Sequence, residues 1–488
     1  MRKPTYLLIF VLMCCNISCD KGFDDLNVNP NEPTTANPDQ LFTGAIYVNA
    51  GQFSTGVNSE IWSMEVWMQM LADINGVEAG TNYNYNGSWN DALWNEWYTK
   101  VLSPCNQIIE LTENDPFLVN KNSIARILRA HNFHRITDLW GDIPYFEALS
   151  GFNTGNPPIL NPAYDSQQSI YLDLLDELET AVNAIDQGKP GYGSADAMYN
   201  GDLNKWIKFG NSLRFRMAMR LSEASPAVAQ QIISELLMNE ADMISSQNDG
   251  AYFQFYSGQE HPFYALDISG QGLRNPSNYL LEVLKSNNDP RVSIYAAASP
   301  SSEALGTDPY VGVPNNKTSI ELNSLGVNAF TTSEVGTYFR DVEIQGTVLS
   351  YAEMCFLKSE AALYGWGGSS SAEDYYQEGI RAAMEWIETP AEDIDAYLNE
   401  NGSFNGTLEE IITQKWISLV YRDGFEAFAE YRRTGFPILT DENNEAIDLS
   451  QFPKRLPYPP SEWTLNGENV SQTGLGINNN TTPVWWDQ

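Results

Sequence analysis

IARILRAHNFHRITDLWGDIPYFEAL, residues 124–149, carries the clearest helical pattern of the chain, and that predicted helix ends more abruptly than any other. Its apolar residues recur at helical spacing, so one face should be buried. Gly141 follows Trp140 at a position suited to positive φ, and Pro144 prevents the helix from restarting. We therefore expect this stretch to belong to a rigid helical scaffold.

Amphipathic helical patterns recur on both sides of this stretch. They cover residues 38–48, 59–71, 88–111, 166–186, 202–222, 349–363, 372–386, 408–420 and 425–433. Short connections between consecutive helices favour antiparallel hairpins. The hairpins keep no strict 34-residue period, so the pattern indicates an irregular relative of the tetratricopeptide fold. The predicted fold class is mainly α.

The middle of the chain is different, because it lacks long periodic segments and is rich in Ser, Asn, Gly, Pro and Tyr. Only residues 276–285 carry a clear helical pattern there. So much irregular chain inside a folded protein is typical of functional loops on a scaffold. We predict one domain over residues 38–488, with a helical scaffold at 38–242 and 349–433, a loop-rich ligand-binding part at 243–348 and a C-terminal tail at 434–488.

The N-terminus has the pattern of a secretory signal. Arg2 and Lys3 are followed by an apolar run at residues 7–13 that is too short to span a bilayer. The run ends in Ser18-Cys19, which resembles the cleavage box of bacterial lipoproteins, in which the cysteine becomes the lipidated first residue. We expect a signal peptide at 1–18, lipidation at Cys19, a tether at 19–37 and no other membrane attachment. The alternative is an ordinary secreted protein.

Charge and cysteine content exclude several classes of protein. The chain has 27 Lys and Arg against 63 Asp and Glu, a net charge of −36, which disfavours binding to nucleic acid. Beyond the signal and the lipidated Cys19, only Cys105 and Cys355 remain, so a disulfide framework is excluded. We expect two buried free thiols, although a single bridge between them stays open.

Catalytic and metal-binding signatures are missing from the sequence. It contains no G-x-S-x-G elbow, no P-loop and no H-E-x-x-H motif. His131 and His134 lie three residues apart on one helix, but no matching metal ligands accompany them, so structural roles are favoured. We predict no enzyme activity, catalytic residue, metal or cofactor. An acidic glycoside hydrolase is a less favoured alternative, because no carboxylate pair is marked by spacing.

Aromatic residues embedded in Asn- and Gly-rich loops give the strongest functional pattern. Sugar rings stack their C–H faces on Trp or Tyr, and their hydroxyls pair with short polar side chains. The alternative is that each aromatic residue anchors its own loop onto the helices. Our candidate ligand-binding residues are Asn82, Tyr83, Tyr85 and Trp89 in a first stretch, residues 82–89, and Tyr256 and His261 in a second, residues 252–264.

Several segments resemble the SusD/RagB family of surface lipoproteins, in particular its SusD-like_2 branch. The matching segments occur in order over nearly the whole mature chain. They are LNVNPNEPT, LRAHNFHRITDLWGDIPYFEAL, GDLNKWIKFGNSLRFRMAMRLS, the turn Asp289-Pro290-Arg291, LSYAEMCFLKSEAAL, IITQKWISLVYRDGFEAFAEYRRTGFP and PKRLPYPPSEW. This resemblance implies a SusD-like fold, with four tetratricopeptide-like hairpins that support an irregular ligand-binding part.

The resemblance also implies a function. Members are lipid-anchored at the cell surface of the outer membrane, where they capture oligosaccharides for a SusC-like TonB-dependent transporter. Binding residues vary between members and lie outside the matching motifs, so none is transferred to this chain. The alternative within the same architecture is a peptide or glycoprotein cargo.

Overall fold

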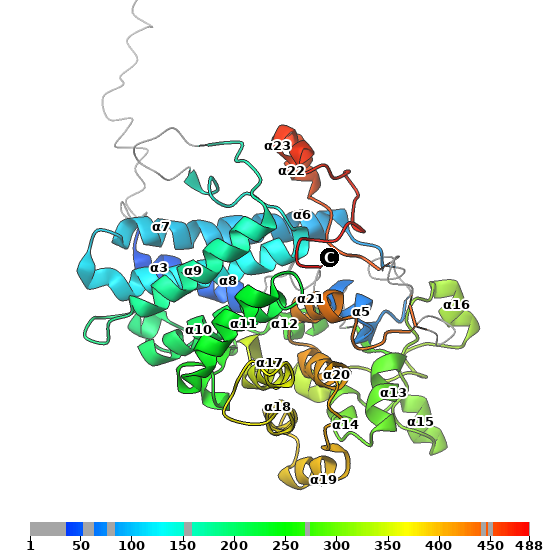
Figure 1. The fold of residues 1–488 in the computed structure, drawn as a ribbon. Helices are drawn as coiled ribbons and strands as arrows, with labels where there is room; N and C mark the ends of the chain where they lie inside the picture. Colours follow the sequence, from blue (N-terminus) through cyan, green and yellow to red (C-terminus); the bar gives the residue numbers. More distant parts are fainter. Residues whose placement is uncertain are drawn as a thin grey trace, which may run out of the picture.

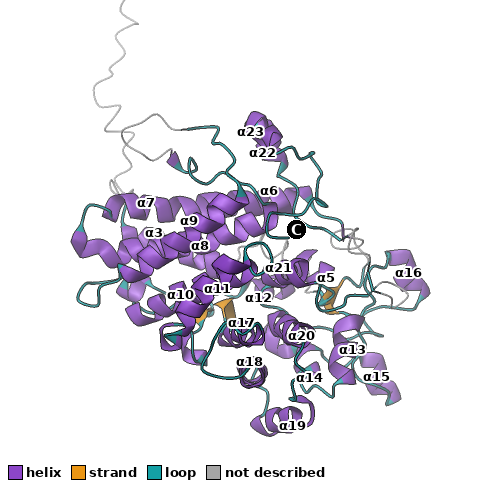
Figure 2. Ribbon diagram, in the orientation of Figure 1, coloured by secondary structure: helices purple, strands orange, loops and turns teal. Residues whose placement is uncertain are grey.

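The structure, a computed structural model, describes residues 36–51, 63–75, 83–150, 159–268, 274–440, 446–447 and 452–487. It is built almost entirely of helices, with two small two-stranded sheets (Figures 1 and 2). The predicted fold class, mainly α, is confirmed. Cys19, the proposed signal, residues 20–35 of the tether and Asn82 lie outside the described residues. None of the described helices is both long and apolar enough to cross a membrane.

The helices of the first half are coloured blue to green in Figure 1, and most of them pack against another helix of this half. They are α3 Pro38–Gly51, α5 Glu65–Trp67, α6 Gly87–Glu96, α7 Ser103–Thr112, α8 Val119–Trp140, α9 Gln167–Asn183, α10 Leu203–Arg220 and α11 Pro226–Leu237, and a π-helical turn, Trp97–Leu102, joins α6 to α7. The end of α8 is as predicted: Gly141 has φ +78° and its N–H donates to the carbonyl oxygen of Thr137 at 2.8 Å.

The second scaffold half is a further set of helix pairs, coloured yellow to orange in Figure 1. They are α17 Tyr351–Leu363, α18 Ala372–Trp386, α19 Ala391–Asn401, α20 Leu408–Leu419 and α21 Gly424–Thr434, followed by the short α22 Pro460–Leu465 and α23 Gly467–Gln472 in the C-terminal tail. α17 and α18 form the hairpin that the sequence predicted. The tail folds back, because the indole of Trp486 is buried and its Nε1–H donates to Asp138 Oδ1 at 2.9 Å.

The loop-rich middle holds more helix than the sequence indicated. Short helices punctuate it: α12 Pro262–Ile268, α13 Asn278–Ser286, α14 Val292–Tyr295, α15 Pro300–Leu305 and α16 Ser319–Ser324. Only α13 was expected. Helices this short contain too few apolar repeats to give a periodic pattern.

Two antiparallel strand pairs join segments that are far apart in the sequence. β1 Leu71–Ala72 pairs with β3 Asn275–Pro276, and β2 Ala251–Gln254 pairs with β4 Gln345–Leu349. The helix expected at residues 59–71 is shorter in the structure: within the described residues, 63–64 are π-helical, α5 covers Glu65–Trp67, and β1 begins at Leu71. Asn86 caps α6, because its side chain accepts from the N–H groups of Ser88 and Trp89.

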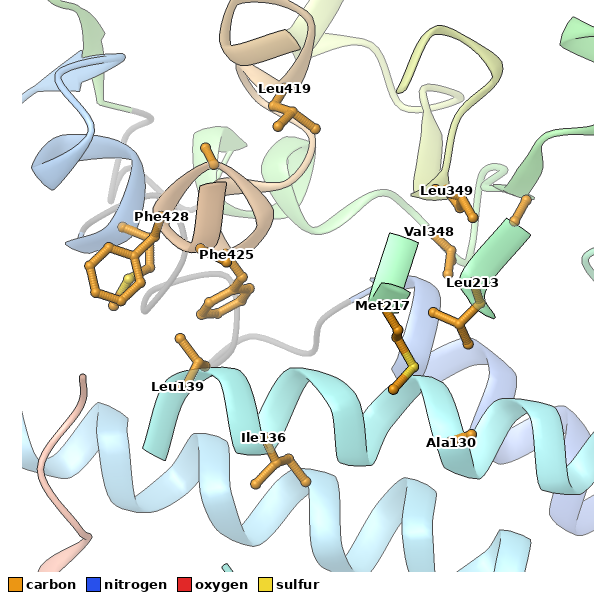
Figure 3. Packing of buried hydrophobic residues seen from close by; sticks show 14 of the residues in the cluster. Ala130, Ile136, Leu139, Leu213, Met217, Val348, Leu349, Leu419, Phe425 and Phe428 are labelled. Carbon is orange, nitrogen blue, oxygen red and sulfur yellow. The ribbon is translucent and has the colours of Figure 1, made fainter. Parts of the chain in front are cut away.

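The two scaffold halves share one core, and Figure 3 shows part of it: side chains from α8, α10, α20, α21 and β4 gather in one cluster. Leu139 of α8 lies toward Phe425 of α21 in this view. Buried ion pairs run through the same region and link α8, α10, α17, α20 and α21. Their members are Asp138, Arg216, Arg220, Glu353, Glu360, Lys415, Glu426, Glu430 and Arg433. Cys105 and Cys355 are buried free thiols, as expected.

Candidate functional site

Three residues of the first predicted stretch lie against the C-terminal tail or on α6. The ring of Tyr83 packs edge-on against Phe452 with centroids 5.1 Å apart, and the hydroxyl of Tyr85 donates to Asn478 Oδ1 at 3.0 Å. Trp89 is half-buried in the first turn of α6. These contacts are of the kind expected from aromatic residues that anchor their own loop.

The second predicted stretch follows β2 and places its two candidates differently. Tyr256 is 54% exposed at a tight turn, where its N–H donates to the carbonyl oxygen of Gln259 at 3.2 Å. The imidazole of His261 is buried between the rings of Phe255 and Phe263, and burial lowers its pKa to about 3. His261 is therefore neutral at physiological pH and supports the loop from inside.

The two predicted stretches do not meet. The first contacts the C-terminal tail, whereas the second contacts α3, where Tyr47 packs against Phe253 and Phe255. No ring contact or hydrogen bond found among residues 83–150 and 159–268 joins Tyr83, Tyr85 or Trp89 to Tyr256 or His261. A single ligand site that includes both stretches therefore has no support from their contacts.

The structure instead places a cleft beside β2, at the end of α18. It consists of two neighbouring cavities of about 470 and 700 Å³. Both are lined by Gln254, Gln345, Trp386 and Glu388, so they form one continuous feature, which we call the Trp386 cleft. Volumes in this range suit small-molecule and oligosaccharide ligands. The remaining lining residues are Ala197, Met198, Tyr199, Lys205, Gln247, Asn248, Gly250, Tyr252 and Glu385 on one side, and Thr337, Tyr338, Asp341, Glu343 and Ile344 on the other.

Pairing of β2 with β4 positions the amides of the cleft. Gln254 and Gln345 are partners in the strand register, and Gln345 Nε2 donates to Gln254 Oε1 at 3.0 Å. Gln254 Nε2 in turn donates to the carbonyl oxygens of Glu343 at 2.6 Å and Phe255 at 3.0 Å. Because each amide is held by another group, the cleft presents polar groups in fixed positions.

Trp386 is the last residue of α18 and forms the aromatic wall of the cleft. The guanidinium of Arg422 lies over its ring, 3.5 Å from Cζ to the centroid. Tyr338 packs against the indole at 5.7 Å between centroids, and its hydroxyl donates to the carbonyl oxygen of Trp386 at 2.7 Å. Tyr252 lies at 6.4 Å. Contacts on several sides thus fix the indole in one orientation.

Tyr338 and Tyr252, the two tyrosines of the cleft that contact Trp386, remain neutral at physiological pH. Burial raises the pKa of Tyr338 to about 12 and that of Tyr252 to about 12. The cleft therefore offers neutral hydroxyls, amides and aromatic edges to a ligand. These are the groups that pair with the hydroxyls and C–H faces of a sugar.

The histidines of α8 lie inside the scaffold, away from the cleft. His131 and His134 are both buried, and His134 Nε2 lies 3.1 Å from Asp138 Oδ2. Burial lowers the pKa of His131 well below its usual value. The structural roles favoured for both residues agree with this packing. Within the part of the chain that the structure describes, no group of three or more His, Cys, Asp or Glu side chains could hold a metal ion.

Most of the cleft was not predicted as a site. Tyr252 and Gln254 do belong to the second aromatic stretch, but Trp386 ends an amphipathic helix, where a large aromatic residue indicates core. Gln345 carries no motif at all. Glu388, in the turn after Trp386, has φ +60°, but this backbone conformation cannot be read from the sequence, and Tyr83 of the first stretch shares it at φ +58°.

Comparison with known proteins gives one family. The model of the SusD-like_2 family, described as starch-binding associating with outer membrane, matches residues 30–459. No curated protein matches the chain.

Solved structures give the same fold over nearly the whole chain. A chitin-binding protein is 28% identical, with a TM-score of 0.80, over 93% of this chain and all of the other (100%). A chitin-binding SusD homolog from Flavobacterium johnsoniae is 24% identical, with a TM-score of 0.77, over 92% of this chain and 98% of that one. A SusD homolog from Bacteroides uniformis is 24% identical, with a TM-score of 0.76, over 92% of this chain and 98% of that one. At 24% identity the likeness shows the fold.

Proposed function

This chain belongs to the SusD-like_2 family of outer-membrane-associated starch-binding proteins, and from that premise we propose that it binds an oligosaccharide in the Trp386 cleft. The observation that carries the proposal is the fixed set of amides beside a buried aromatic wall, because it matches the two faces of a sugar. The 28% identical structure is that of a chitin-binding protein, which supports a glycan as the ligand class.

We further propose that the protein acts by capture and transfer, without catalysis. Anchored to the cell surface through lipid on Cys19, it would deliver the glycan to a SusC-like TonB-dependent transporter. The signal-like N-terminus and the outer-membrane association of the family support this placement. Replacement of Cys19 by Ala should release the protein from the membrane fraction, and purified protein should liberate no reducing sugar from any bound oligosaccharide.

Calorimetric titration with a panel of malto-, chito-, xylo- and manno-oligosaccharides tests the binding function. At least one member should bind, and Gln345→Leu should weaken that binding, because an apolar side chain cannot replace the amide pair with Gln254. Removing one buried or bound hydrogen bond of this kind costs about 1–3 kcal/mol, which is about 5- to 150-fold in Kd.

Tyr256→Ala is the matched control, since Tyr256 is 54% exposed and does not line the cleft. It should leave binding unchanged. If Tyr256→Ala abolished binding while Gln345→Leu did not, the ligand site would lie at the turn after β2, as the sequence suggested. Absence of binding to every oligosaccharide, with binding to a peptide panel, would instead favour a peptide cargo.

A further inference from the structure

The Trp386 cleft is rimmed by negative charge. Asp341, Glu343, Glu385 and Glu388 all line it and are exposed. None of the four takes part in an ion pair found within residues 159–268 and 274–440, whereas many other acids of the chain are paired. Lys205 is the single Lys or Arg among the lining residues, and its Nζ donates to Asn248 Oδ1 at 3.2 Å.

Local structure fixes the backbone that carries these carboxylates. Glu388 lies just past α18 with φ +60°, and its N–H donates to the carbonyl oxygen of Glu385 at 3.0 Å. On the opposite rim Asp341 Oδ1 accepts from the N–H of Glu343 at 2.8 Å, and the carbonyl oxygen of Glu343 accepts from Gln254. The left-handed backbone conformation costs a non-glycine residue about 1–3 kcal/mol, so it persists only where surrounding contacts hold it.

A second feature of the cleft indicates a ligand independently of charge. Trp386 is only 8% exposed, lines both cavities, and its Nε1–H has no hydrogen-bond acceptor among the described residues. An indole N–H is a donor only, and a buried donor without a partner is costly. A ligand oxygen that reached this edge would satisfy it.

Besides Lys205, a further positive charge lies behind the wall. Arg422 is buried over the ring of Trp386, and no acceptor for its Nε, Nη1 or Nη2 is found among the described residues. Its charge disfavours a cation directly on the indole face. A cationic group would therefore lie at the rim, next to Glu343 and Glu388, while a neutral sugar face and its oxygens meet the wall.

We propose that the Trp386 cleft selects oligosaccharides that carry protonated amino sugars over their neutral and acidic counterparts. The inference rests on the proposed glycan-binding function and names its substrate class. An amino sugar presents both required features on one ring: an ammonium group for the rim carboxylates, and hydroxyls for the amides of Gln254 and Gln345. A uronic acid would meet the same four carboxylates with repulsion.

Titration with chemically matched trimers tests the proposal. The probes are the glucosamine trimer, the N-acetylglucosamine trimer and trigalacturonate, each at about pH 6 and at about 20 and 200 mM NaCl. Each exposed ion pair contributes up to about fivefold, so the glucosamine trimer should bind about tenfold more tightly than the neutral trimer at low salt. The preference should shrink at high salt, because the carboxylates are exposed. Trigalacturonate should not bind.

Charge-removing variants locate the effect. The double variant Glu343→Gln with Glu388→Gln should reduce the preference to about threefold or less. The matched control, Glu113→Gln with Asp176→Asn, removes the same charge from α9 and the end of α7 and should leave the preference intact. Thermal unfolding of both double variants confirms that each is folded.

The possible outcomes distinguish failure of the amino-sugar preference from failure of the proposed glycan binding. Equal affinity for the glucosamine and N-acetylglucosamine trimers at low salt would overturn the amino-sugar preference and leave glycan binding in place. If no saccharide bound at all, both would fail. Trilysine that bound as tightly as the glucosamine trimer would also overturn the assignment, since the cleft would then respond to charge without recognising a sugar.

Discussion

Glu430→Gln should destabilise the protein strongly, because Glu430 is a buried carboxylate at the junction of the two scaffold halves. Its oxygens lie 2.8 Å from Arg433 Nη2 and 3.3 Å from Lys415 Nζ, and Arg220 also donates to it. Burial opposes the charged form, but the positive charges of Arg433, Lys415 and Arg220 outweigh it and lower the pKa of Glu430 to about 2.

Two routes give the size of the effect. A shift from an ordinary glutamate pKa of about 4.5 to about 2 corresponds to about 3 kcal/mol of stability at neutral pH. Removing one partner from a buried ion pair costs about 3–5 kcal/mol in other proteins. We therefore expect Glu430→Gln to lower the free energy of unfolding by about 3 kcal/mol at pH 7.

The pH dependence gives a sharper test than the magnitude. Because the folded-state pKa is depressed, the contribution of Glu430 is fully present above about pH 4.5 and is lost as the pH falls toward 2. Urea unfolding followed by tryptophan fluorescence should therefore show a difference between wild type and Glu430→Gln that falls to about half by pH 3. The exposed Glu400→Gln on α19 is the control and should change little. Parallel acid profiles, or a difference below about 1 kcal/mol at pH 7, would refute the reasoning.

Two further predictions concern packing and the C-terminal tail. A Cβ at Gly379 of α18 would lie 2.7 Å from Phe356 Cε1, so Gly379→Ala should lower the free energy of unfolding in urea by about 1–3 kcal/mol. Gly44→Ala on α3 is the control, because no atom lies within 4 Å of its added Cβ, and it should raise the free energy of unfolding by up to about 1 kcal/mol. An unchanged stability of Gly379→Ala would contradict the tight packing. Burial raises the pKa of Asp487 to about 6, so ionisation of this carboxyl destabilises the fold as the pH rises through 6. Asp487→Asn should therefore raise Tm at pH 8 but not at pH 4. A gain of equal size at both pH values would show that charge burial is not the cause.

The helical scaffold could be predicted from the sequence because its signals are local. Ser166 and Asp202 begin α9 and α10 as side-chain caps, and Gly141 ends α8 with positive φ. Each of these signals depends on residues within a few positions of one another. The burial of α8 was underestimated, because its pattern predicted one buried face, whereas the structure buries most of the helix, including His131 and His134.

The short elements of the middle of the chain could not be predicted in this way. α14, at Val292–Tyr295, completes about one helical turn, so it has no periodicity to detect. Such turns form because the surrounding chain holds them: the hydroxyl of Tyr295 donates to the carbonyl oxygen of Ile417 at 2.9 Å, more than a hundred residues away. Contacts between residues so far apart in the chain cannot be predicted from a local sequence pattern.

The Trp386 cleft could not be predicted from the sequence for a related reason. Aromatic residues next to Asn and Gly look alike in sequence whether they face solvent or hold a loop onto the helices, and Tyr83, Tyr85 and His261 have contacts of the second kind. A site needs convergence of several segments, and the Trp386 cleft obtains it only when β2 pairs with β4 beside the end of α18. Gln254 and Gln345 become neighbours through that pairing, and neither residue has any special context of its own. In a fold of this kind local sequence patterns determine the scaffold, while ligand specificity depends on which loop ends the scaffold brings together. Substitutions at the strand register should therefore alter ligand choice with little effect on helical content.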